Sequence, residues 1–326
     1  MTSATATGAS YFGKLPSRGD FVQGGTQSRL ITLLDRWASA SMEVLSENPR
    51  WKLIFDSAAG LDFAFVGAHS PHSVIGHLKP SRDASGRRFP LIAATAITRR
   101  DQLGFRYGPI GFSGLWGMFR SSLEAALDTD HGSNSLDALT CIDCAAAADL
   151  ALRNSPLLRF ARTTTLAQLS AETGSSIAAT RRQILSIGLL LNPVSGRRQC
   201  RIERGLCLPL PDAARTRCSV AGFWLYLITA MLRETDCELQ ILLGRVQGKE
   251  RMIIGFNGAS PRTLTGVLSP ATLDDAVLLL DDPCWIDTHP ALHATPAIAR
   301  LVSYLEHPSL TLEAVLNTFC EVFAHK

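Results

Sequence analysis

Two loops rich in arginine carry the side chains of this chain that are best suited to recognition chemistry. They read FGKLPSRGDF at residues 12–21 and PSRDASGRRFPL at residues 80–91, and each combines Gly, Pro, Arg and Asp. A guanidinium group forms forked hydrogen bonds with a carboxylate, so both loops are suited to hold an acidic group of a partner or of the chain itself. The candidate residues for partner binding or loop bracing are Lys14, Arg18, Asp20, Ser81, Arg82, Asp83, Arg87 and Arg88.

The composition of each loop predicts a fixed shape. Pro16 fixes its own φ and favours an extended Leu15, while Gly19 is free to take the positive φ of a reversal. In the second loop, Ser85-Gly86 is typical of a hairpin turn. Two interpretations stay open: the arginines contact a partner, or they tie the two loops to each other through internal ion pairs. Both place the loops side by side at one edge of a sheet.

The spacing of apolar residues predicts alternating strands and helices around these loops. An amphipathic helix is expected over residues 27–46, where apolar side chains recur at three- and four-residue steps. Residues 88–97 are largely apolar, which is typical of a strand covered on both faces. Further strands are expected at 51–55, 63–69, 73–78, 201–210, 238–244 and 251–256, and further helices at 112–127, 136–152 and 220–232, with helices from there to the C-terminus.

Strands interleaved with helices favour an α/β fold. The expected architecture is a three-layer sandwich, with a central mixed β-sheet covered by helices, plus a helical insertion. The expected segments are an N-terminal α/β region (8–128), a helical, helix-turn-helix-like insertion (129–199), a second part of the α/β domain (200–290) and C-terminal helices (291–326).

The pairing of YFGKLPSRGDFV with a later PSRDASGRRFPL resembles the TagF (ImpM) family of type VI secretion accessory proteins. That family carries a GKLPxRGDF-like loop and a PSxDxxGRxFPL-like loop in the same order. Between them, WKLIFD and FAFVGAH resemble the strands that the family places there. The resemblance weakens from Ser219, where the family's Ser-x-Trp-Trp-like opening is replaced by SVAGFWLYL with Trp224 alone, and residues 129–199 carry no matching motif.

The resemblance implies a cytoplasmic accessory protein without catalysis and without a cofactor. Members of the family act as post-translational repressors of type VI secretion through a forkhead-associated scaffold protein, which is the expected partner here. In some relatives the domain is fused to a PP2C-type phosphatase, whose Asp-Gly-containing metal motifs this chain lacks. The two arginine loops would then form or brace the contact surface.

The overall composition agrees with an intracellular protein. The chain has 326 residues and a formal charge of +3, which is too small to indicate nucleic acid or acidic lipid as a partner. No secretory signal is expected in MTSATATGAS, and the longest apolar stretch, residues 221–232, is shorter than the ~20 residues of a membrane-spanning helix. The eight cysteines are therefore expected as thiols in a reducing compartment.

The alternative function is nucleic-acid binding by residues 166–187. This segment resembles a helix-turn-helix, with Gly174 at the turn and Arg181 and Arg182 exposed on the second helix. The following GLLLNPVSGRRQCRI would add a wing-like hairpin with three more arginines. However, helix pairs joined by a glycine are common packing units, and DNA-binding proteins ordinarily have a more basic surface, which argues against nucleic acid.

Metal-binding and catalytic patterns are weak, and none is predicted to form a site. His69, His72 and His77 would suit zinc, but strand ends also collect histidine by chance. CIDC at residues 141–144 has redox or zinc spacing, yet it lies in an Ala-rich helical pattern without a second pair, so core thiols are expected. The aspartates that flank residues 278–280 are expected at a solvated helix end or opposite arginines elsewhere.

Overall fold

The computed structural model describes residues 8–98, 103–128, 133–153, 155–198 and 202–324. These residues form one nine-stranded sheet with the order β2-β1-β5-β4-β3-β7-β8-β6-β9. All neighbouring strands are antiparallel except β6 and β9, which are parallel. The strands are β1 (Ser10–Lys14), β2 (Phe21–Gly24), β3 (Leu61–Gly67), β4 (His72–Lys79), β5 (Leu91–Thr98), β6 (Gly205–Pro209), β7 (Glu238–Val246), β8 (Lys249–Gly255) and β9 (Val277–Leu279).

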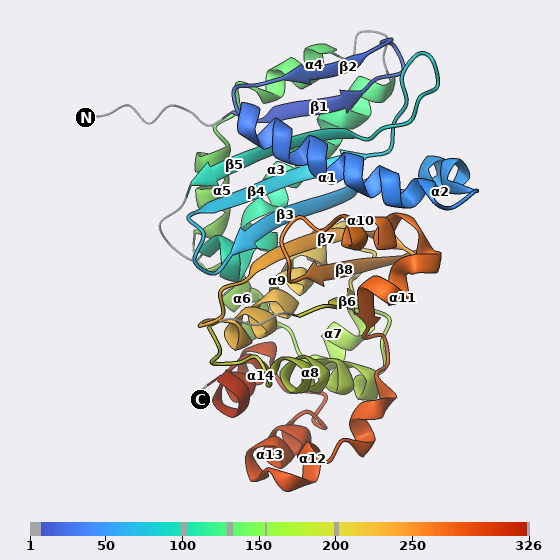
Figure 1. Ribbon diagram of the computed structural model, residues 1–326. Coiled ribbons are helices and arrows are strands. Elements are labelled where there is room, and N and C mark those ends of the chain that lie inside the picture. Colours follow the sequence, from blue (N-terminus) through green and yellow to red (C-terminus); the bar gives the residue numbers. More distant parts are fainter. Residues whose placement is uncertain (1–7, 99–102, 129–132, 154, 199–201, 325–326) are drawn as a thin grey trace.

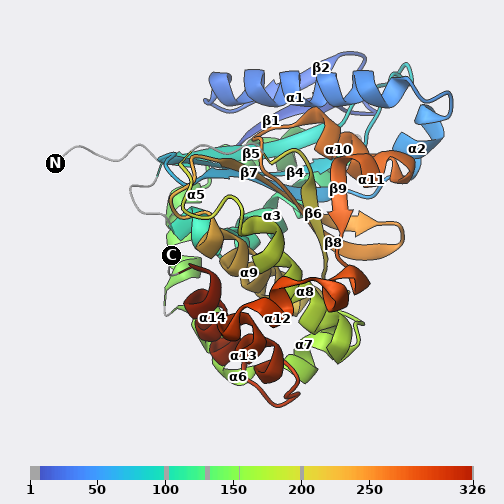
Figure 2. The ribbon, with the colours of Figure 1, turned by 60° about the horizontal axis from the view of Figure 1, so that its bottom comes forward.

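Helices cover both faces of the sheet (Figures 1 and 2), which confirms the expected three-layer α/β sandwich with a mixed sheet. The α-helices are α1 (Ser28–Ser46), α2 (Trp51–Ser57), α3 (Leu103–Asp128), α4 (Ser133–Leu139), α5 (Cys144–Leu152), α6 (Pro156–Thr163), α7 (Leu166–Glu172), α8 (Ile177–Leu191), α9 (Ala214–Met231), α10 (Pro261–Leu268), α11 (Leu273–Ala276), α12 (Ala291–Ala294), α13 (Pro296–Tyr304) and α14 (Leu312–Phe319). Shorter turns lie at Pro270–Thr272, Cys284–Thr288 and Cys320–Ala324. In the described part of the chain, no helix is sufficiently long and apolar to span a membrane.

Two apolar cores lie on the two faces of the sheet, because side chains alternate along each strand. On the α1 face, the Trp37 ring packs 5.1 Å from the rings of both Phe63 and Phe65 of β3. On the α3 face, Trp116 is fully buried and its indole N–H donates to the Phe63 carbonyl at 3.1 Å. The central strands are therefore buried on both sides, as their apolar sequences predict.

Several expected boundaries are wrong. Residues 51–55, expected as a strand, belong to α2, because their apolar residues Trp51, Ile54 and Phe55 follow helical spacing in a run too short to distinguish the two states. The helix expected over 136–152 is two helices, since Asp143 caps α5 by accepting from the Ala146 amide at 3.0 Å. Strands β1, β2 and β9 and helix α6 were not expected. The expected wing-like hairpin is wrong in residues 192–198, which form turns; its continuation at 199–201, including the expected strand start at 201, lies outside the described residues.

The antiparallel order brings distant connections to the same end of the strands. The β1–β2 connection, the β4–β5 connection, the link from α2 to β3 and the β7–β8 turn all lie there, because successive strands reverse direction. Both arginine loops are among these connections (Figure 1). The sheet thus positions the two motifs that the sequence singles out.

Candidate functional site

The two arginine loops lie side by side and are hydrogen-bonded to each other, as the sequence predicts. The first connects β1 to β2 and the second connects β4 to β5. Backbone and side-chain bonds join them: the Ala84 amide donates to the Arg18 carbonyl at 2.8 Å, and the Ser81 hydroxyl donates to the Lys14 carbonyl at 2.7 Å. The Arg87 guanidinium also donates to the carbonyl of Gly19 at 2.6 Å. The two motifs therefore form a single structural unit, called the paired loops below.

Asp83 is the centre of the paired loops. Its Oδ1 accepts from the backbone amides of Ser85 (3.0 Å) and Arg87 (2.9 Å). Its Oδ2 accepts from Lys14 Nζ and Arg87 Nε, both at 2.7 Å. The Asp83 side chain is fully buried, and that of Lys14 is only 7% exposed. The hydrogen bond from Lys14, followed by those from Arg87, holds the pKa of Asp83 well below its usual range, so this carboxylate stays charged at neutral pH.

The glycines of the paired loops have roles that differ in part from expectation. Gly86 has φ 78° in the turn where the Gly86 amide donates to the Asp83 carbonyl at 2.9 Å, which confirms the expected hairpin turn. The expectation that Gly19 takes a positive φ is wrong. The positive φ in the first motif belongs to Gly13 (143°), at the closest approach to the second loop.

Arg88 extends the bracing to helix α2. Its Nε and Nη2 donate to the two carboxylate oxygens of Asp56 at 2.8 and 2.6 Å. This forked bond is the main reason that the pKa of Asp56 is lowered. Sequence reasoning missed Asp56, because WKLIFD was expected as a strand and its last residue had no assigned role.

Three charged residues of the paired loops face solvent instead. Arg18 and Arg82 are exposed, and within the described residues neither guanidinium forms a hydrogen bond or an ion pair. Arg18 does not pair with the nearby Asp20, whose Oδ1 accepts from the next amide, that of Phe21, at 2.8 Å. The paired loops therefore contain a braced interior and a set of side chains that remain available.

An exposed aromatic ring accompanies these free cations. Phe21 is 44% exposed, yet its ring stacks on Phe12 at 5.2 Å and packs edge-on against Phe89 at 5.1 Å. Lys14 Nζ lies 5.0 Å from the centre of the same ring. The signal in the sequence was the phenylalanine that ends each charged run, in RGDF and in GRRF. Because its neighbours hold it, Phe21 presents an apolar surface in one orientation.

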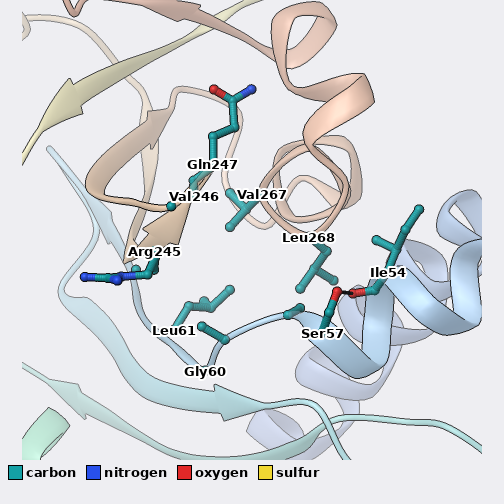
Figure 3. Close-up of a pocket in the computed structure, with 13 residues that line it drawn as sticks. Ile54, Ser57, Gly60, Leu61, Arg245, Val246, Gln247, Val267 and Leu268 are labelled. Atoms are coloured by element: carbon teal, nitrogen blue, oxygen red, sulfur yellow. Dashed lines mark hydrogen bonds between the residues drawn. The ribbon is translucent and has the colours of Figure 1, made fainter.

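Two hollows lie at this end of the strands, on either side of α2. The first is at the paired loops and is lined by Pro16, Asp56, Pro80, Ser81, Arg82 and Leu127. The second is more apolar, with the side chains of Leu61, Val267 and Leu268 gathered around it between α2, α10 and the β7–β8 turn (Figure 3). Asp56 lines the first hollow, whereas Ile54 and Ser57 of the same helix line the second. The Arg88–Asp56 pair thus fixes the wall between them.

Among the described residues, the histidines and cysteines do not assemble a metal site. His77 is buried, with Nδ1 2.7 Å from Asp62 Oδ1, and Arg120 donates to the other Asp62 oxygen at 2.5 Å. His72 lies five residues away on the opposite face of β4, with Nδ1 3.2 Å from the Thr98 hydroxyl. The CIDC segment spans the break between α4 and α5, where Cys141 is exposed and Cys144 buried. No group of three or more metal-ligating side chains occurs in the part of the chain that is described.

The helix-turn-helix-like segment forms α7 and α8, with Gly174 between them. Its two arginines, expected to be free, are paired with acidic residues of the C-terminal region. Arg181 donates to Glu306 at 3.2 Å, and Arg182 donates to Asp282 at 2.6 Å and to Asp287 at 2.9 Å. These arginines therefore hold α8 against the C-terminal region. Of the two expectations for the aspartates near residue 281, a solvated helix end or a position opposite arginines, Asp281 and Asp282 follow the second, since they pair with Arg251 and Arg182.

Comparison with known proteins agrees with the motifs. Residues 10–141 match the family model of the TagF N-terminal domain, which is described as type VI secretion system-associated. This stretch of the chain is a TagF N-terminal domain. Both arginine loops lie inside it, so the paired loops belong to the domain that matches this type VI secretion system-associated family.

The chain was also compared with curated proteins and with solved structures. None of the curated proteins matches the chain. Among solved structures, the chain is similar to PA0076 from Pseudomonas aeruginosa PAO1, with 25% identity and a TM-score of 0.36. That match covers 41% of this chain and 61% of the other, so the chain spans less than two thirds of this relative.

The TagF domain contains a tyrosine whose titration tests the packing of α4 on the sheet. Burial, and then the hydrogen bond from its hydroxyl to Asp137 Oδ1 at 2.7 Å, raise the pKa of Tyr11 to about 12. We expect the ultraviolet titration difference between the wild type and Tyr11→Phe to be centred near that value. Because the unfolded tyrosine loses its proton near pH ~10, this group's contribution to stability is full below that pH and is lost towards pH ~12. A difference centred near pH ~10 would show that the Tyr11–Asp137 contact is absent.

Proposed function

We propose that this protein is a non-enzymatic, cytoplasmic accessory protein that represses type VI secretion post-translationally by binding a forkhead-associated scaffold protein through its paired loops. The TagF domain supports the link to type VI secretion. The observation that supports the contact surface is the pair of exposed guanidiniums, Arg18 and Arg82, neither of which forms a hydrogen bond or an ion pair within the described residues.

In the paired loops, some charged residues brace the backbone and others are displayed to solvent. This separation favours recognition over bracing alone. Lys14, Asp83, Arg87 and Arg88 hold the backbone through charged hydrogen bonds. A fixed backbone lowers the entropy that a loop loses on binding, so side chains displayed from it bind more strongly than those on a mobile loop. Arginine and aromatic residues also dominate the binding energy of protein interfaces.

The chemistry of the displayed groups indicates the kind of surface they contact. Arg82 lines a hollow that also contains the rings of Pro16 and Pro80, and Arg18 lies on the neighbouring loop. Two guanidiniums whose donors bind no group of the described residues favour a carboxylate or another anionic group that accepts a forked hydrogen bond. The partner surface is therefore acidic, with an apolar residue in contact with Phe21.

Charge reversal of the free arginines tests this proposal. We expect Arg18→Glu and Arg82→Glu each to weaken binding to the purified forkhead-associated scaffold by roughly tenfold or more, which is about 1.4 kcal/mol. The melting temperature should stay unchanged for Arg18→Glu, whereas Arg82→Glu should lower it slightly, because the charge of Arg82 helps to stabilise the Asp56 carboxylate. Arg29→Glu, at an exposed arginine of α1, is the matched control and should bind as the wild type does. The measurement is titration calorimetry with parallel thermal melts.

Two results separate the parts of the proposal. Wild-type affinity in both charge-reversed variants would move the contact surface away from the paired loops. Failure of the wild type to bind the scaffold would exclude that partner. In cells, overproduction of the wild type should reduce the type VI substrate in culture supernatants, whereas the Arg18→Glu/Arg82→Glu double variant should not.

A further inference from the structure

The two outer edges of the sheet are built differently. At one edge, β9 has three residues and acidic residues on both flanks, and the Arg204 guanidinium donates to the carbonyls of Asp274 and of Val277, the latter at 2.9 Å. Charged flanks, short length and side-chain hydrogen bonds are ways in which proteins protect a sheet edge from pairing with another strand. The β9 edge is therefore protected.

The opposite edge, β2, is also short and directly follows Asp20, but within the described residues no side chain of another element binds its backbone. Its sequence, FVQG, contains no charge and no proline, and it pairs with β1 alone among the described strands (Figure 1). Besides that pairing, its backbone forms one hydrogen bond within the described residues, from the Phe21 amide to Asp20. Apart from these bonds, none of the described residues pairs with the side of β2 that faces away from β1.

We propose that β2 accepts an extended segment of a partner protein as an additional strand, with an apolar side chain over Phe21 and an acidic side chain towards Arg18. Phe21 starts the strand, and its ring is partly exposed and fixed by Phe12 and Phe89. Arg18 precedes β2 by three residues and carries a free charge. In strand addition the main chain supplies affinity and alternate side chains supply specificity, which matches this combination.

The short length of β2 argues for a peptide segment rather than a second copy of this chain. Four residues extend over only about 13 Å, and pairing of two such strands is far smaller than the roughly 1,200–2,000 Å² that a stable interface buries. A flexible peptide needs only this edge. Its acidic character follows from the exposed Arg18, whose guanidinium forms no hydrogen bond or ion pair within the described residues.

Peptide selection tests the proposal without any assumption about type VI secretion. A random 12-residue peptide library displayed on phage is selected against the full chain, and an enriched peptide is synthesised and measured by fluorescence anisotropy. We expect enriched peptides with alternating apolar residues and an acidic residue at one end. N-methylation of successive peptide amides should weaken binding at least tenfold at every second position, because alternate amides face the added ladder.

Substitutions in the protein give the second arm. In Val22→Pro and Gln23→Pro, one proline removes an amide that faces β1 and the other removes an amide on the open edge. The variant that keeps the wild-type melting temperature identifies the open-edge amide, and it should lose peptide binding at least tenfold. Arg18→Glu should change the selected charge from acidic to basic, while Arg29→Glu should not.

Several outcomes would overturn the proposal. These are no enrichment of peptides, N-methylation effects without a two-residue period, and wild-type binding in both proline variants. If both proline variants unfold, the N-methylation series decides alone. A dimer in sedimentation equilibrium that is lost in the proline variants would show that a second copy occupies β2. Since no scaffold protein is used, these results are independent of the scaffold-binding test.

Discussion

Replacement of Asp83 by alanine is expected to lower the melting temperature by roughly 4–8 °C, whereas Asp20→Ala should change it by less than about 1 °C. Both aspartates belong to the arginine loops and look alike in sequence. Asp83, however, is buried and accepts four hydrogen bonds, while Asp20 is exposed and accepts one from its neighbouring amide. The difference in melting temperature between these two variants therefore measures how much the buried hydrogen bonds of Asp83 stabilise the fold.

The size of the Asp83 effect comes from what the substitution leaves behind. Lys14 Nζ would stay charged and nearly buried without its carboxylate, and two backbone amides would lose their acceptor. Lys14→Met combined with Asp83→Ala removes the stranded charge, so we expect the double variant to lose less stability than the sum of the single variants. Differential scanning calorimetry at neutral pH is the measurement. Equal melting temperatures for Asp83→Ala and Asp20→Ala would contradict the central role of Asp83.

Lowering the pH should reduce the difference in melting temperature between the wild type and Asp83→Ala. The pKa of Asp83 is lowered in the folded chain, so its contribution to stability is complete above the ordinary aspartate value of ~3.9 and is lost as pH falls below it. The melting temperatures of the wild type and Asp83→Ala should therefore converge below pH ~4.

The elements that the sequence predicts well are those with long or strongly patterned apolar segments. Helix α1 and strands β4, β7 and β8 fall close to their expected positions, because their burial is decided by their own periodicity. The hairpin turn at Ser85-Gly86 is also local, since a positive φ at glycine and the strands on either side determine it. Helix α2 is the contrast: seven residues carry too few repeats to separate a strand from a helix.

The pairing inside the candidate site depends on contacts that no local pattern contains. Sequence reasoning places the two loops together, but it does not distinguish Asp83 from Asp20 or Arg88 from Arg18. Arg88 binds Asp56, which lies 32 residues away, and Lys14 binds Asp83, which lies 69 residues away. The choice between bracing and display follows from the register of β1 and β5, which brings Lys14 beside the second loop. For the same reason, Arg181 and Arg182 could not be recognised as ion-paired residues from their own helix.

The second large effect on stability is expected from replacing a glycine of the first arginine loop by alanine. Gly13→Ala is expected to destabilise the fold by at least about 2 kcal/mol, while Gly19→Ala should be close to neutral. At Gly13 the backbone has φ 143°, and an added Cβ would lie 2.2 Å from the Pro90 carbonyl oxygen and 2.7 Å from Leu91 Cα. At Gly19 nothing lies within 4 Å of the added atom, and φ is not in the positive range.

The clash at Gly13 cannot be relieved by a side-chain movement, because both contacts are backbone atoms, one in Pro90 directly before β5 and one in Leu91 at its start. The register from Phe12↔Ile92 to Ser10↔Ala94 holds the two strands together. To admit a methyl group, β1 has to move away from the start of β5, and this movement separates Lys14 from Asp83. The Phe12–Phe21 stack, which depends on the same strand, is then lost as well.

This coupling predicts that Gly13→Ala affects recognition as well as stability. We expect weaker binding of the scaffold and of a selected peptide at a temperature where the variant is still folded, since Arg18 and Phe21 are no longer held in place. The measurements are thermal melts, which give the stability of Gly13→Ala and Gly19→Ala, and titration calorimetry, which gives their affinity for the scaffold and the peptide. If Gly13→Ala lowers the melting temperature but binds with wild-type affinity, then the displayed side chains do not depend on the braced interior, and the paired loops act only as a structural element.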